Sequence, residues 1–312
     1  MKAWKRCWLM LVGLFMTCAA MAQTPVAPTP PTALESAWRE IRLQNWKGAK
    51  ALFEKELKQT VTNSDEFDQC KLGIALCLHH IQPDTESDKQ EAGKLYDELI
   101  ERTAGKPIQV LAMLYRARLA DQIDYYEDEP DLETALKLYD QILENFPDSP
   151  YIHHAALYKA QLAVNKMTRE SSTEGIAQID AWLSKYPDNL FRSIFLSLKG
   201  QALVYPMEDY KAAAATFAAI EKDGKLPGHV QPDAHLWRIA NLAQKAGDTE
   251  MAIAYYTRLI KEVERSGYGF ESYVRLKELG VENPPEVIDP FADTPVDDSA
   301  SMDTPEEKGA DQ

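Results

Sequence analysis

The chain has 312 residues and a formal charge of −15, with 49 acidic residues against 34 basic ones. This acidic balance argues against a nucleic-acid partner, because binding phosphates requires a basic face. Length alone predicts about two domains, but a chain of stacked repeats grows by addition and escapes that estimate. No alternating strand pattern persists in the sequence, so we expect an all-α fold.

Residues 1–22 have the organisation of a secretory signal peptide. A basic start is followed by an apolar run over 8–16, which is too short to cross a bilayer. Ala20-Met21-Ala22 then forms an A-x-A cleavage site. The sequence therefore predicts an exported protein, periplasmic or secreted, whose mature chain begins at Gln23.

A lipid anchor at Cys18 is the alternative to simple cleavage. The segment 15–18 departs from the usual processing site, which has Leu first and a small residue before the cysteine. Only such an anchor would attach the protein to a membrane, since no later segment is apolar enough to span one. Residues 23–32 hold four prolines and form an extended, Pro-rich linker before the folded region.

The folded region is expected over 33–280, as about six helix pairs followed by a helix that covers the exposed end. Helical spacing of apolar residues and the stops between them set the boundaries. One such stop is Pro147, which ends the helix before it. In chain order the expected helices are 34–43 and 46–58, 66–80 and 87–102, 107–123 and 132–145, 151–166 and 172–185, 191–204 and 208–222, 232–246 and 249–266, and finally 270–279.

A repeat runs through these helices. A small residue is followed four positions later by an apolar or aromatic residue, and the small residues are 43, 43, 40, 38 and 39 positions apart. Six occurrences at a nearly constant spacing indicate a repeat architecture. The pairs are Ala49/Phe53, Ala92/Tyr96, Ala135/Tyr139, Gly175/Ile179, Ala213/Phe217 and Ala252/Tyr256.

This pattern, with a proline late in the unit, resembles the tetratricopeptide repeat. The last unit matches best, with Ala240, Gly247, Ala252 and Tyr256 at the family's offsets. The resemblance implies helix pairs stacked in a right-handed solenoid with a concave groove. Units of the family have about 34 residues, so the longer units here imply insertions in the turns. The segment 146–151, followed by Ala155 and Tyr158, is also similar to envelope proteins of this family, such as the periplasmic Tol–Pal partner and the repeat lipoprotein of outer-membrane assembly.

The resemblance also implies where a partner would bind. In the family, the first helix of each pair lines the concave face, and the residue after its small residue points into the groove. The small residues Ala117, Ala160, Gly200 and Ala240 map this position onto polar side chains in four successive units. The expected groove residues are Arg118, Gln161, Gln201 and Asn241, with Trp237, Gln244 and Lys245 flanking the last. Ordinary polar surface residues are the alternative interpretation.

Other candidate chemistry is weak. Cys70 and Cys77 lie about 10.5 Å apart along one expected helix, and a disulfide needs Cα atoms within about 7 Å, so we expect two packed thiols. The adjacent histidines of 79–80 and 153–154 point about 100° apart and do not suit one metal. The acidic turn around Asp128 lacks the order of an EF-hand, which favours a solvated loop over a Ca²⁺ site. No nucleophile, phosphate-loop or cofactor motif is present.

Residues 281–312 carry ten acids against one lysine, and we expect a disordered acidic tail there. The sequence as a whole predicts an exported, non-enzymatic scaffold that binds a protein or peptide, with no cofactor and no metal. One alternative is an assembly subunit that packs through its outer face or its ends. Another is an enzyme or ligand receptor with a pocket inside the superhelix.

Overall fold

A computed structural model describes residues 32–83, 85–122, 129–222, 226–228 and 230–288. The expected signal peptide, the Cys18 anchor and nearly all of the Pro-rich linker lie outside these residues. So do the centre of the acidic turn, with Asp128, and most of the acidic tail.

Within this described part, the chain forms thirteen α-helices and no strand, which confirms the all-α class and a helical solenoid. Each helix packs against the next, and α13 packs on α12. The six pairs and the last helix are α1 (Ala33–Arg42) and α2 (Trp46–Leu57), α3 (Asp65–His80) and α4 (Glu86–Arg102), α5 (Pro107–Ala120) and α6 (Leu132–Asn145), α7 (Ile152–Asn165) and α8 (Arg169–Lys185), α9 (Arg192–Val204) and α10 (Tyr210–Lys222), α11 (Pro232–Lys245) and α12 (Thr249–Glu262), and α13 (Gly269–Glu278).

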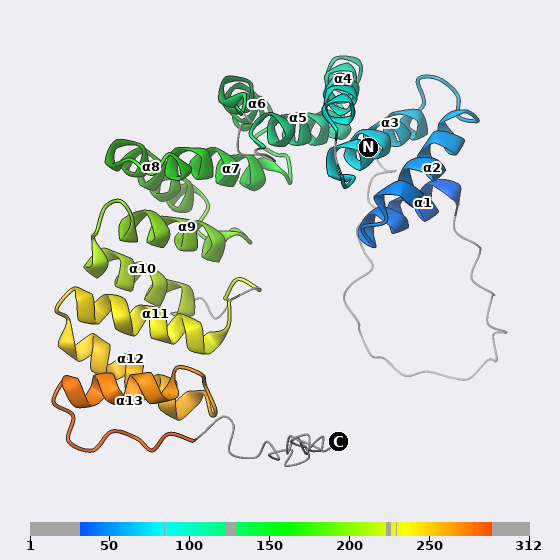
Figure 1. Cartoon of the computed structure of the whole chain (residues 1–312). Helices are drawn as coiled ribbons and strands as arrows, with labels where there is room; N and C mark the ends of the chain where they lie inside the picture. Colours follow the sequence, from blue (N-terminus) through cyan, green and yellow to red (C-terminus); the bar gives the residue numbers. More distant parts are fainter. Residues whose placement is uncertain (1–31, 84, 123–128, 223–225, 229, 289–312) are drawn as a thin grey trace, which may run out of the picture.

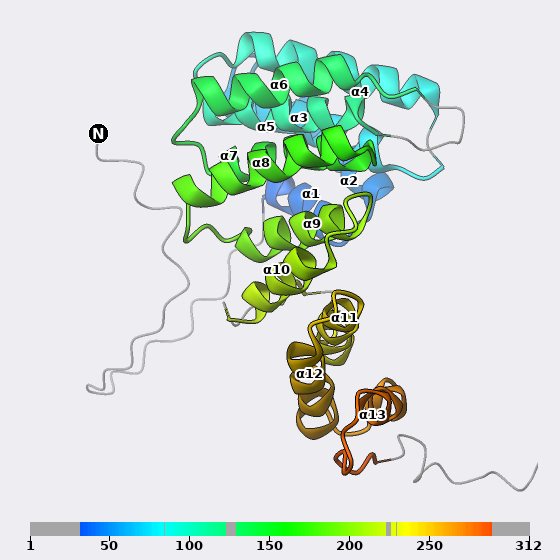
Figure 2. The same cartoon turned by 90° about the vertical axis from the view of Figure 1, so that its left-hand side faces the viewer.

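The solenoid is an open arch. Helices α1 to α3 form one end, α4 to α7 cross the top, and α8 to α13 descend on the other side (Figure 1). In Figure 2 the middle helices run across the view, whereas α11 and α12 point partly toward the viewer. The helix axes therefore rotate from unit to unit, as expected when each pair stacks on its neighbour at a small angle.

Caps and prolines explain most helix ends. α6 ends at Asn145, two residues before Pro147. α8 begins at Arg169, three residues earlier than the sequence predicts, because Thr168 caps it. The Thr168 hydroxyl accepts a hydrogen bond from the Ser171 amide at 3.1 Å, and the Ser171 hydroxyl lies 3.3 Å from the Thr168 amide.

The six repeat positions form the core of the arch. The small residue of each unit is buried, and the residue four positions later is 0–1 % exposed in every unit. Tyr139 lies between its own unit and the next, since its ring is 6.1 Å from that of Tyr158 in α7. The predicted register is therefore confirmed at Tyr139. The spacing of small and apolar residues predicted this register, because the same helix face must be buried in each stacked unit.

Three ion pairs join successive units. Each links an aspartate on the second helix of one unit to a basic residue on the first helix of the next, 19 positions later. The pairs are Asp97–Arg116 at 3.0 Å, Asp140–Lys159, and Asp180–Lys199 at 2.6 Å. The basic residue always precedes the small residue of its helix, so this series has the period of the repeat. The series adds little stability, because half-exposed ion pairs contribute about 0–1 kcal/mol each.

Residues 281–288 differ from the unpacked tail that composition predicts. Val281 and Val287 pack on the C-terminal core cluster. A Cβ atom at Gly269 would lie 3.1 Å from Val287, and the Lys277 ammonium donates to the Glu282 carbonyl at 2.6 Å. Val281 follows the end of α13 and Val287 lies beside Gly269 at its start, so the packed region extends to Val287.

Candidate functional site

Two adjoining hollows lie on the face made by the first helices of units four to six. Their volumes are about 350 and 400 Å³, and both are lined by Gln201, Ala234 and Arg238. We call them together the C-terminal trough. The remaining lining comes from α7, α9, α10, α11, the segment before α11 and the residue that caps α13: Leu157, Gln161, Ile194, Ser197, Leu198, Val204, Phe217, Pro227, Val230, Gln231, Trp237, Asn241, Leu242 and Tyr268.

Four of the seven predicted groove residues line this trough. Gln161 and Gln201 share one hollow, while Gln201, Trp237 and Asn241 share the other. The three amides come together because each occupies the same place on the first helix of its unit, and these helices line the same two hollows, while Trp237 lies about one helical turn before Asn241. Each amide group can donate and accept hydrogen bonds.

The other three predicted groove residues lie elsewhere. Arg118 is 2.8 Å from the buried Asp121 carboxylate and stacks over the Tyr158 ring at 4.4 Å, so a partner already neutralises its charge. Gln244 accepts a hydrogen bond from the Tyr256 hydroxyl at 2.9 Å. The Lys245 ammonium lies 5.6 Å from the Tyr210 ring. None of the three lines the trough.

Arg238 is the residue of the trough that sequence reasoning missed. It lines both hollows, and its guanidinium carbon lies 5.0 Å from the centre of the Phe217 ring. The sequence prediction took one groove position from each unit and therefore omitted Arg238, which lies three residues before Asn241. Residues three apart on a helix share one face, so this spacing could have predicted that Arg238 lies beside Asn241.

Two rings shape the end of the trough. Trp237 stacks on Tyr268, with centroids 5.4 Å apart and planes at 17°.

His235 of the same helix as Trp237 is buried, and its Nε2 lies 3.1 Å from the Phe217 carbonyl. Burial is the main cause that lowers the pKa of His235, and the nearby Arg238 charge acts in the same direction. His235 is therefore a neutral donor at pH 7.

A separate hollow, of about 480 Å³, lies near the other end of the arch. Its walls are mostly apolar and include Trp38, Leu72 and Leu111. Its charged groups neutralise one another. The Lys106 ammonium is 2.9 Å from Asp65 and 3.4 Å from Asp68, which Arg102 also contacts at 2.8 Å. The hollow offers apolar contact but no charge without a partner at its base.

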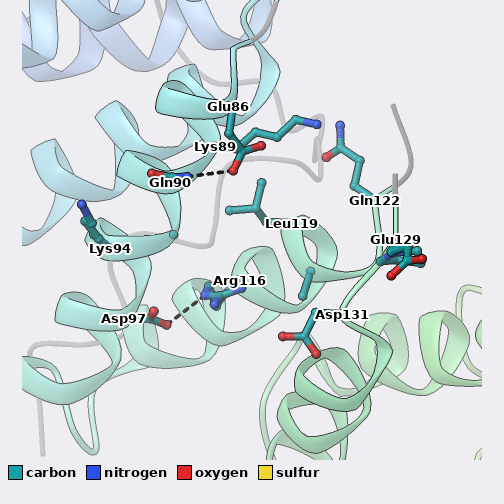
Figure 3. Close-up of a pocket in the computed structure, with 13 residues that line it drawn as sticks. Glu86, Lys89, Gln90, Lys94, Asp97, Arg116, Leu119, Gln122, Glu129 and Asp131 are labelled. Atoms are coloured by element: carbon teal, nitrogen blue, oxygen red, sulfur yellow. Dashed lines mark hydrogen bonds and ion pairs between the residues drawn. The ribbon is translucent and has the colours of Figure 1, made fainter. Parts of the chain in front are cut away.

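A cavity of about 640 Å³ lies between α4, α5 and the start of α6 (Figure 3). Both signs of charge meet there. Arg116 pairs with Asp97 at 3.0 Å, Gln90 donates to Glu86 at 2.9 Å, and Asp131 caps α6 through the Thr134 amide at 3.0 Å. These contacts belong to the unit junction and the helix cap, which account for them without a ligand.

The thiols and histidines have structural surroundings. Cys70 and Cys77 are buried and free, and burial raises their pKa values to about 11 and about 12, so neither is a thiolate near pH 7. His79 and His80 stack on each other, and His153 contacts Trp182. No group of three or more His, Cys, Asp or Glu residues in the described chain is placed to hold a metal ion.

None of the described helices has both the length and the hydropathy needed to cross a bilayer.

Comparison with known proteins identifies the repeat. The tetratricopeptide repeat model matches residues 111–149 and 236–266, which span most of α5–α6 and α11–α12. Both segments are similar to tetratricopeptide repeats, a class of helix pair that serves in scaffolds for protein–protein interaction. No curated protein matches the sequence. Among solved structures, the chain is similar to a tetratricopeptide repeat protein from Parabacteroides merdae ATCC 43184, with 12% identity and a TM-score of 0.48 over 79% of this chain and 84% of that one.

Proposed function

We propose that this protein is an exported, non-enzymatic scaffold that binds a segment of another protein in the C-terminal trough. One observation carries the proposal. Gln161, Gln201 and Asn241, from three successive units, line two hollows that share Gln201. Amides in such a row can pair with the alternating carbonyl and amide groups of an extended chain.

The proposal also places the protein in the cell envelope. The signal at residues 1–22 supports export, and the segment 146–151 supports kinship with envelope repeat proteins.

A triple variant tests the trough. Gln161→Ala, Gln201→Ala and Asn241→Ala should together remove the partner, since each lost hydrogen bond costs about 0.5–1.5 kcal/mol of binding. The measurement is crosslinking in the native envelope, followed by affinity capture and mass spectrometry. Helical circular dichroism and the unfolding midpoint should stay close to those of the parent, because surface substitutions usually change stability by less than about 0.5 kcal/mol.

A matched control keeps the comparison specific. Gln90→Ala, Gln141→Ala and Gln178→Ala remove three amides from the second helices α4, α6 and α8, and this variant should retain the partner. Capture of every parental partner by the trough variant would refute the proposal. Loss of partners from the control alone would favour an assembly subunit that uses its outer face.

A further inference from the structure

The trough has an unusual charge character for this chain. Acidic residues outnumber basic ones by 49 to 34 in the sequence, yet among the residues that the structure describes no carboxylate lines either hollow. Arg238 is the one charged side chain that the described part of the chain contributes to this lining. A binding surface with this composition selects a ligand by its negative charge.

Arg238 has no carboxylate partner among the described residues. Other arginines of the solenoid do have one, as Arg102 has in Asp68 and Arg258 has in Glu221. Instead, the Arg238 guanidinium lies over the Phe217 ring, 5.0 Å from its centre. A guanidinium that stacks on a ring keeps the N–H groups at its edge, where they match the two oxygens of a carboxylate.

Gly200 fixes the ring on which Arg238 rests. A Cβ atom at this position would lie 2.6 Å from the Phe217 Cζ atom, so only glycine lets the ring approach the α9 backbone so closely. Phe217 is 1 % exposed. The platform under Arg238 is therefore rigid, and the guanidinium is held in place before a ligand arrives.

Apolar surface flanks this charge on both sides. The stacked rings of Trp237 and Tyr268 border one hollow, and Ile194, Pro227 and Val230 border the other. Tyr268 is 37% exposed. The net charge of the protein repels a highly acidic ligand, so a single carboxylate between apolar side chains fits this surface better than an acidic run.

We infer that the trough recognises an extended peptide segment with one Asp or Glu side chain that pairs with Arg238. In the same segment, a neighbouring aromatic or aliphatic side chain enters the hollow beside Trp237 and Tyr268. This inference rests on the proposed function and names the chemistry of the partner. It makes Arg238 the residue that sets specificity, while the amides bind the peptide backbone.

Selection from a library of short random peptides, displayed on their encoding RNA, tests the inference on the full chain. The baits are the parent, Arg238→Gln, Arg238→Lys and a control, Arg169→Gln. Arg169 is a suitable control because its side chain is 67% exposed and it lies outside the trough. Circular dichroism verifies that each bait is folded.

Peptides enriched by the parent and by Arg169→Gln should contain an Asp or Glu close to an aromatic or aliphatic residue. The best peptide should lose about tenfold or more in affinity when its carboxylate is replaced by the amide. Arg238→Gln should bind both peptides equally, and Arg238→Lys should show an intermediate preference because the two-pronged contact is lost.

The outcomes separate this inference from the proposed function. Failure of the parent to enrich any peptide would refute peptide binding in the trough altogether. Enrichment of peptides without a carboxylate, or a carboxylate preference that persists in Arg238→Gln, would overturn the role of Arg238 and leave the trough as a binding site. Should Arg238→Gln fail to fold, the comparison of parent with Arg238→Lys still decides the question, since equal preference in the two contradicts the paired contact.

Discussion

The hydroxyl of Tyr139 donates a hydrogen bond to the Asp121 carboxylate at 2.6 Å and so joins the second helix of the third unit to the end of its first. The Asp121 side chain is 1% exposed, and Arg118 lies 2.8 Å from its other oxygen. Burial raises the pKa of Asp121, whereas the contacts with Tyr139 and Arg118 act to lower it. A buried carboxylate thus depends on one phenol and one guanidinium.

Two substitutions at Tyr139 should separate packing from hydrogen bonding. Tyr139→Ala removes a fully buried ring and should lower the free energy of unfolding by about 3–5 kcal/mol. Tyr139→Phe keeps the ring but leaves the buried carboxylate with one partner fewer, which should cost about 1–3 kcal/mol. Urea denaturation followed by circular dichroism measures both. If both variants lost the same free energy of unfolding, packing of the ring would not be the main contribution of Tyr139.

Gly200→Ala should destabilise the fifth unit, in which Gly200 on α9 meets Phe217 on α10, although it adds only one methyl group. The new Cβ atom would lie 2.6 Å from the Phe217 ring, so the ring or the α9 backbone must shift. Overpacking of this kind costs about 1–3 kcal/mol, more than the helical preference for Ala over Gly returns, which is about 1 kcal/mol. Gly93→Ala is the matched control, because its nearest neighbour would be 3.7 Å away. That variant should be neutral or slightly stabilised in thermal unfolding.

Four buried or half-buried histidines should make the protein less stable in mild acid. Burial lowers the pKa of His80, His153, His154 and His235 in the folded state. The unfolded chain takes up their protons near the ordinary value of about 6.5, while the folded chain resists protonation. Their stabilising contribution is therefore complete above about pH 6.5 and is lost as the pH falls toward the folded-state values, by at most about 1.4 kcal/mol per pH unit for each group.

His235 offers a clean test of this dependence, since it is 2 % exposed. Arg238 and Glu221 face it with opposite charges, and burial is the dominant cause of its lowered pKa. His235→Gln can still donate to the Phe217 carbonyl but does not titrate. The fall in unfolding midpoint between pH 7.5 and pH 5 should be smaller in this variant than in the parent. An unchanged pH dependence would show that other groups cause it.

Periodicity predicted the fold because stacking imposes the same demand on each unit. Ala135 and Tyr139 must be buried in their helix for the same reason as Ala252 and Tyr256 in theirs, and the sequence displays that requirement directly. Local chemistry also located most helix ends, as at Pro147. It missed the start of α8 because the cap at Thr168 uses Ser171 in place of the usual Glu or Gln.

The site was less accessible to sequence reasoning, because pairing across helices decides which charges are available. Arg118 and Arg238 both lie on first helices. Arg118 occupies the predicted groove position after Ala117, whereas Arg238 lies about one helical turn before that position in its own unit. In the structure Asp121 neutralises the first, while the second rests on Phe217. Nothing in a single-helix pattern distinguishes these two situations. The expectation that the residue after each small residue faces the groove correctly predicted the amides, because their placement depends only on the helix face.

Processing of the N-terminus is a separate prediction. Cleavage after Ala22 should give a mature chain that begins at Gln23, with no lipid attached. Intact mass spectrometry of protein recovered from cells measures this directly, and Ala22→Arg should block cleavage and retain the precursor mass. A diacylglycerol adduct at Cys18 would instead establish a membrane-anchored lipoprotein.

Two truncations should show where the solenoid ends. Removal of residues 289–312 should leave the thermal midpoint nearly unchanged, because this stretch is rich in acids and poor in apolar residues. Removal of 281–312 also takes away Val281 and Val287, which pack on the C-terminal core. Each half-buried valine contributes roughly 1 kcal/mol by the area it removes from water, so the shorter chain should unfold several degrees lower. Val281→Ala with Val287→Ala in the full chain should reproduce that loss. Equal midpoints for the two truncations would show that the contacts of 281–288 with α13 add no stability, and the core would then end at Gly280.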